Sequence, residues 1–179
     1  MDDSHETLSY PIGRYEAPER YNPEMQSAWI ESIESLPARL AEAVIGLDEQ
    51  QIDTSYRPGG WTVRQVVHHI ADSHMNAYIR HKLSLTEDSP VVKPYDENNW
   101  GILPDAISTP VEVSVSLITA LHHRWTQLFI NMHPEDWNRT YFHPEHERYV
   151  PLWELADIYA WHGMHHVAQI KHLRVRNNW

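Results

Sequence analysis

Four long segments of the chain place apolar residues three or four positions apart, which is the spacing of one face of an α-helix. The clearest case is the last segment, whose stripe consists of Leu152, Leu155, Tyr159, His162, His166, Ile170 and Leu173. The other three segments cover residues 22–47, 62–86 and 109–132. Amphipathic helices bury their apolar faces by packing against one another. The sequence therefore predicts an all-α fold, a four-helix bundle.

Residues typical of helix starts precede three of these segments. They are Asn22 before Pro23, Thr62 with Gln65, and Thr109 with Glu112. The first pair predicts an N-cap followed by proline at the first helical position. The other two have the spacing of a capping box. Pro37 lies inside the first segment, and we expect it to kink or split that helix.

The segments between the predicted helices differ in character. We interpret residues 1–21 as an N-terminal arm packed on the bundle, and residues 22–179 as one metal-binding domain. Residues 87–108 are predicted to form a long loop, and loops of about 20 residues in compact domains are often functional. Residues 140–150 predict a short hairpin or irregular loop before the last helix.

The composition limits the classes of binding partner and the cellular compartment that we expect for this chain. The net charge of −11 would repel phosphate backbones and anionic lipids, so we expect neither a nucleic-acid nor a membrane partner. The absence of cysteine excludes disulfides and thiolate metal sites. The N-terminus lacks the apolar core of a signal peptide, and no apolar stretch is long enough to span a membrane. These features predict a cytoplasmic protein.

Two histidines of the last segment, His162 and His166, lie four residues apart on its core-facing stripe. Side chains at this spacing project from neighbouring turns of one face, which suits two ligands of one metal ion. The alternative is two core histidines, each satisfied by a hydrogen bond. A buried imidazole without such a partner costs about 1–3 kcal/mol, so we favour the metal. His165, three residues after His162, is a second possible partner but lies on a more mixed stripe.

A third ligand must come from another helix. The second segment offers four histidines, which are His68, His69, His74 and His81. Periodicity favours His74, because it lies closer to the apolar stripe, whereas His69 lies roughly 100° to one side. In the third segment, we expect His122 and His123 to be structural.

Several motifs resemble those of the DinB/YfiT superfamily. Residues 60–74 (GWTVRQVVHHIADSH) resemble its second-helix motif, and residues 162–170 (HGMHHVAQI) resemble its fourth-helix motif. Residues 10–13 (YPIG) and 93–97 (KPYDE) are similar to the narrower YfiT branch. The resemblance implies a four-helix bundle that holds a metal ion through three histidines. Carried over residue by residue, these are His69, His162 and His166, so the resemblance selects His69 over His74.

The resemblance also implies a function. It suggests a metal-dependent hydrolase, often dimeric, with one divalent metal ion per chain, zinc in the first place or nickel, acting on a small-molecule substrate. Three protein ligands leave a coordination position open, which is typical of a catalytic site. Related branches include thiol S-transferases that use bacillithiol, which is the main alternative. A non-enzymatic metal-binding stress protein is the third.

A hydrolase of this kind also needs a general base. Asp96 and Glu97, in the predicted loop over residues 87–108, could reach the open face of the metal. The alternative is that both are solvated loop carboxylates.

Overall fold

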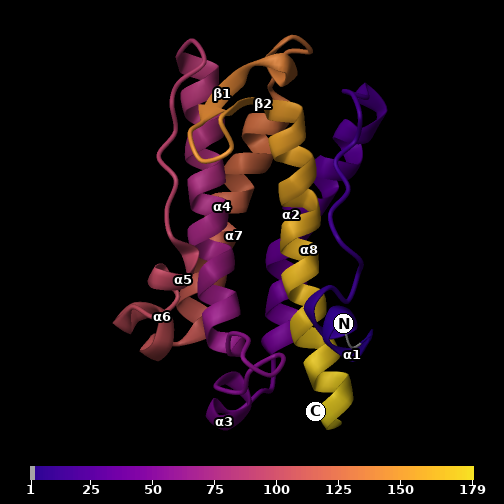
Figure 1. Cartoon of the computed structure of the whole chain (residues 1–179), viewed down its shortest axis with the longest axis vertical. Helices are drawn as coiled ribbons and strands as arrows, with labels where there is room; N and C mark the ends of the chain where they lie inside the picture. The colour runs from indigo at the N-terminus through magenta and orange to yellow at the C-terminus, as the bar shows by residue number, and fades with distance from the viewer. Residues whose placement is uncertain (1–2) are drawn as a thin grey trace.

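Four long helices form the body of the protein in the computed structural model, which describes residues 3–179 (Figure 1). They are α2 (Gln26–Val44), α4 (Val63–Thr86), α7 (Val111–Ile130) and α8 (Leu152–Asn177). Helices α2 and α4 each pack against both α7 and α8. The predicted four-helix bundle is therefore confirmed. Over the described residues, no helix is both long and apolar enough to cross a membrane.

Shorter elements join the long helices. They are α1 (Asp3–Ser9), η1 (Pro23–Met25), α3 (Glu49–Ile52), α5 (Glu97–Trp100), α6 (Pro104–Ser108) and η2 (Asp136–Asn138), with the strands β1 (Thr140–His143) and β2 (Arg148–Pro151). The strands pair antiparallel, so the predicted hairpin before the last helix is confirmed. The prediction of an unbroken loop over residues 87–108 is wrong, because this segment contains α5 and α6. Helices of four and five residues are too short to show an apolar stripe.

The N-terminal segment contacts the last helix. Helix α1 lies beside the C-terminal half of α8 (Figure 1). The Tyr15 hydroxyl donates to Asp157 at 2.8 Å, and the Gln169 amide donates to the Ser9 carbonyl at 2.9 Å. Residues 1 and 2 of the predicted arm lie outside the described residues. The division of the chain into an arm and one domain stays a prediction.

Of the three predicted helix starts, one is as predicted, one caps a different element and one is wrong. Thr62 and Gln65 form both hydrogen bonds of a capping box at the start of α4. Asn22 caps as predicted, but the turn that it caps is the 3-10 turn η1, which precedes α2. The capping box predicted at Thr109 is wrong, because α7 begins one residue later than that box requires and its N-cap is Pro110.

Pro37 does not split its helix, since α2 continues through it from Gln26 to Val44. The helix ends three residues before the predicted boundary at residue 47.

Two hydrophobic clusters fill the core. One includes Trp29, Trp125 and Trp137, and the other includes Ile70 and Ile170. Each long helix contributes to both clusters. Along α4, α7 and α8, a histidine lies between the residues of the first cluster and those of the second. These histidines are His74 on α4 and His122 on α7, which are buried, and His162 on α8, which is half-buried. The apolar core is therefore interrupted by a layer of imidazole rings.

Candidate metal centre

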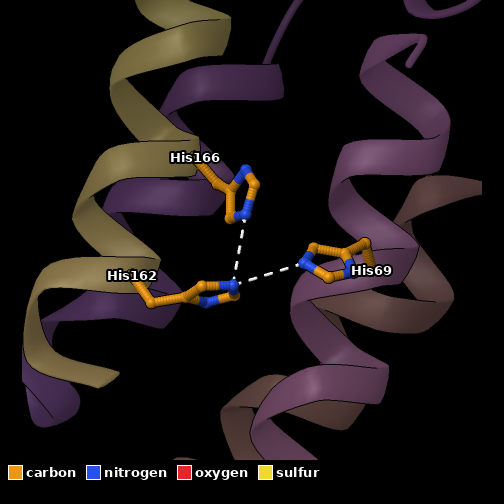
Figure 2. Close-up of side chains that lie close together, drawn as sticks. All are labelled: His69, His162 and His166. Carbon is orange, nitrogen blue, oxygen red and sulfur yellow. Dashed lines mark hydrogen bonds between the residues drawn. The ribbon is translucent and has the colours of Figure 1, made fainter. Parts of the chain in front are cut away.

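Three imidazole rings converge where α4 faces α8 (Figure 2). The Nε2 atom of His162 lies 3.3 Å from Nε2 of His69 and 3.2 Å from Nε2 of His166. One ligand atom from each ring lies within 4.8 Å of the others. The structure therefore brings together the three histidines that the family resemblance selects. Their role as ligands stays a prediction.

The two separations from His162 Nε2 fit a metal ion. Metal–nitrogen bonds of about 2.1 Å in a tetrahedral arrangement separate ligand nitrogens by about 3.4 Å. The separations of 3.2 and 3.3 Å lie close to this value. Because all three approaching atoms are Nε2, the rings present equivalent nitrogens to one point.

The hydrogen bonds of His166 fix which of its nitrogens carries the proton. Its Nδ1 lies 2.8 Å from the Gln169 side-chain oxygen, and an amide oxygen only accepts. The Gln169 amide nitrogen donates to the Ser9 carbonyl and lies 3.0 Å from His165 Nε2, which fixes the orientation of the amide. His166 therefore carries its proton on Nδ1, and its Nε2 offers a lone pair toward His162. This is the form that a metal ligand requires.

Burial keeps these rings neutral. Desolvation, with a smaller contribution from nearby His165, lowers the pKa of His69 to about 4. Desolvation followed by repulsion from neighbouring histidines lowers the pKa values of His162 and His166 well below their usual range. Neutral imidazole is the form that binds metals, so the cluster needs no deprotonation at neutral pH.

Two other candidate ligands lie outside the cluster. His74 is fully buried, but its Nε2 lies against Nδ1 of His162, on the side of the ring away from the cluster. His165 stacks on Trp161 with ring centroids 4.4 Å apart, and its Nε2 faces Gln169. Periodicity favoured His74 as the third ligand, but the structure places it outside the cluster, and spacing does not reveal which side of the His162 ring a neighbour approaches.

Two cavities border the cluster. The first, of about 560 Å³, is lined by His162 together with residues of α4, α5, the hairpin and α8. The second, of about 520 Å³, is lined by His166 with Trp61, Gln169 and residues of the N-terminal segment. Asn98 borders both cavities. A small molecule can therefore approach the centre from either side.

The two carboxylates predicted as general bases both line the first cavity. The Asp96 oxygens accept from the backbone and the side chain of Asn99 at 2.9 and 2.7 Å, so this carboxylate caps α5. Glu97 also lines this cavity, and partial desolvation raises the pKa of its carboxyl group. Of the two, Asp96 is therefore engaged in capping, and Glu97 is the better candidate for a general base.

Sequence reasoning missed two polar contacts of the site. Gln169, which orients His166, lies three residues after it, and that spacing is a usable signal. The Tyr159 hydroxyl lies 3.0 Å from the Ser73 hydroxyl, and both residues line the first cavity beside His162. Tyr159 was assigned only to the apolar stripe, and its spacing does not reveal that its hydroxyl borders a cavity.

Comparison with known proteins assigns the chain to a family. The model of the DinB superfamily matches residues 32–170. A protein of Oceanobacillus iheyensis named "Putative metal-dependent hydrolase" is 51% identical over 170 residues, covering 95% of this chain and 98% of the relative. A protein of the same name from Bacillus cereus strain 03BB102 is 49% identical over 172 residues, covering 96% and 98%. The chain therefore belongs to the DinB superfamily.

A solved structure matches closely. YfiT from Bacillus subtilis, described as a probable metal-dependent hydrolase with an unusual four-helix bundle topology, superposes with a TM-score of 0.94. It is 45% identical, and the match covers 97% of this chain and 99% of YfiT. The resemblance to the YfiT branch that the motifs indicated is confirmed.

Proposed function

We propose that this protein is a metal-dependent hydrolase of small molecules, with His69, His162 and His166 holding one divalent ion, zinc in the first place. The observation that carries the proposal is the convergence of three Nε2 atoms beside a cavity. The names of the relatives from Oceanobacillus and Bacillus support it. Cytoplasmic location and a homodimer belong to the same proposal.

The residues around the proposed centre would have different roles in hydrolysis. A divalent ion bound by three neutral ligands would act as a Lewis acid and lower the pKa of water to around 7. Glu97 accepts a proton as the general base, because the Asp96 carboxylate is engaged in capping α5. Tyr159 and Ser73 line the cavity with hydroxyl groups that can bind a polar substrate.

A thiol S-transferase is the second candidate. Its support is the pair of cavities that meet at the histidines from different sides, since a transferase must bind a thiol and an electrophile together. A bacillithiol-type thiol would occupy one cavity and the electrophile the other. A hydrolase needs only one organic substrate.

Metal content and turnover test both candidates. The protein, purified without an affinity tag, should contain about one metal ion per chain. His69→Ala should lose it, whereas His123→Ala, which changes an exposed histidine of α7, should keep it. Hydrolysis of esters or amides without added thiol supports the hydrolase, and product that forms only with thiol supports the transferase. Unchanged metal affinity in His69→Ala would refute the three-histidine centre.

A further inference from the structure

A series of histidines leads from His162, which is half-buried, through the fully buried His74 and His122 into the core. Nδ1 of His162 lies 3.2 Å from Nε2 of His74, and Nδ1 of His74 lies 3.0 Å from Nε2 of His122. Nδ1 of His122 lies 2.6 Å from the backbone carbonyl oxygen of Ile33. The series thus begins on α8, crosses α4 and α7, and ends on α2.

The final carbonyl sets the direction of every hydrogen bond in the series. A carbonyl oxygen can only accept, so His122 carries a proton on Nδ1. Burial makes a charged imidazolium costly, so His122 is neutral and its Nε2 accepts from His74. The same reasoning places the His74 proton on Nδ1 and makes its Nε2 an acceptor for His162. His162 therefore carries its proton on Nδ1 and points an Nε2 lone pair at the centre.

This assignment has a consequence at the centre. The lone pair of His162 Nε2 faces the lone pair of His166 Nε2, which Gln169 fixes independently, at 3.2 Å. Two lone pairs at this distance repel each other unless a positive charge lies between them. The hydrogen bonds behind both rings thus prepare a cation site.

The Ile33 carbonyl is available because of a proline. In an α-helix, the carbonyl of residue i accepts from the N–H of residue i+4, which for Ile33 is residue 37. Pro37 has no N–H, yet α2 continues through it. A buried carbonyl left without a donor is unfavourable, and His122 supplies the missing hydrogen bond.

We propose that His74 and His122 are positioning residues for the metal ligand His162, and that Pro37 anchors them by freeing the Ile33 carbonyl. The proposal rests on the three-histidine centre proposed above. Without this series, His162 can carry its proton on Nε2 and present N–H to the metal instead of a lone pair. Removal of hydrogen-bond partners behind a ligand typically weakens metal binding 10- to 100-fold.

Zinc affinity of paired variants provides the first test. His122→Phe keeps an aromatic ring in the core but removes both hydrogen bonds of the residue. His81→Phe is the matched control, because His81 is also fully buried but hydrogen-bonds to the Ala77 carbonyl, outside the series. Competition with a chromophoric chelator should show zinc binding weakened about 10- to 100-fold in His122→Phe and within about twofold of wild type in His81→Phe. Equal affinities of the two variants would overturn the proposal.

The positions of the protons on His162 and His74 provide a second test. A purely structural role of His74 and His122 would not change which nitrogen of His162 carries the proton. Nitrogen-15 spectra of histidine-labelled, metal-free protein distinguish protons on Nδ1 from protons on Nε2. His162 and His74 should carry Nδ1 protons in the wild type, and His162 should shift toward the Nε2 form in His122→Phe. An Nε2 proton on His162 in the wild type would contradict the series. These spectra need no metal. They therefore distinguish a failure of the proposed histidine series from a failure of the three-histidine metal centre on which it rests.

If His122→Phe does not fold, the variant Pro37→Ala tests the same series of hydrogen bonds. The new N–H competes with His122 for the Ile33 carbonyl, while alanine suits a helix interior. We expect zinc affinity to fall severalfold although the free energy of unfolding of the metal-free protein does not decrease. Wild-type affinity together with wild-type histidine spectra would refute the part assigned to Pro37.

Discussion

Gly163 lies next to His162, one of the three proposed metal ligands, where α8 packs tightly against α2. A methyl group at this position would lie 2.4 Å from Cδ2 of Leu36 and 3.2 Å from Cε1 of His74. Leu36 is 1% exposed, so its methyl groups cannot turn into solvent to make room. Gly163→Ala should therefore destabilise the protein, although alanine normally favours a helix.

The size of the effect follows from two opposing contributions. Replacing glycine by alanine inside a helix stabilises it by about 1 kcal/mol. Overpacking a core typically costs ~1–3 kcal/mol. The net loss should be roughly 1 kcal/mol, which lowers Tm by about 2–4 °C in a chain of this size.

A double-mutant cycle tests the cause. Leu36→Ala alone should cost about 2–5 kcal/mol, since it leaves a cavity. In that background the methyl group has space, so Gly163→Ala should become neutral or stabilising by up to about 1 kcal/mol. Urea unfolding of the metal-free protein, followed by fluorescence of its 8 tryptophans, measures all four variants. Stabilisation by Gly163→Ala in the wild-type background would show that the contact with Leu36 does not limit this site.

Two further predictions concern buried groups. Desolvation lowers the pKa of His81 to about 4 from 6.5, so the folded protein resists its protonation and metal-free protein loses stability as pH falls from about 6.5 toward 4. His81 alone should account for about 2 kcal/mol of the loss between pH 7 and 5, and urea unfolding of His81→Phe should show a pH dependence reduced by that amount. Gln169→Leu removes the acceptor for His166 Nδ1, and chelator competition should show zinc binding weakened about 10- to 100-fold. Gln169→Glu, which keeps an acceptor oxygen, should retain more affinity, and an equal loss in both variants would contradict the role of this hydrogen bond.

The sequence predicts the long helices well because burial of one helix face repeats regularly along the chain. It predicts their starts less well, because the same residue types can act differently. Thr62 caps α4, whereas Thr109 does not cap α7. Thr109 is the C-cap residue of α6, and its carbonyl accepts one hydrogen bond from Arg64 and lies 3.0 Å from His68 Nε2. Such contacts between distant segments leave no local pattern in the sequence.

The candidate site, too, could be predicted from the sequence only in part. Spacing placed His162 and His166 on one core-facing stripe, and the structure brings them together. For the third position, spacing favoured His74 and the family resemblance favoured His69. Both lie against His162, His74 at its Nδ1 and His69 at its Nε2. Periodicity identifies the face on which a side chain lies, but not which nitrogen of a neighbouring ring it approaches.

The hydrogen bond between the Ser9 carbonyl and Gln169 joins residues 160 positions apart. Gln169 in turn accepts from Nδ1 of His166, so the amide that orients this proposed ligand is held in part by a contact between two distant segments of the chain. Local helix formation precedes such contacts, because closing a long loop costs entropy. During synthesis the hydrogen bonds around His166 are therefore complete only after α8 has emerged and the N-terminal segment has docked on it. A metal ion held at the proposed centre would accordingly meet its finished site late in folding.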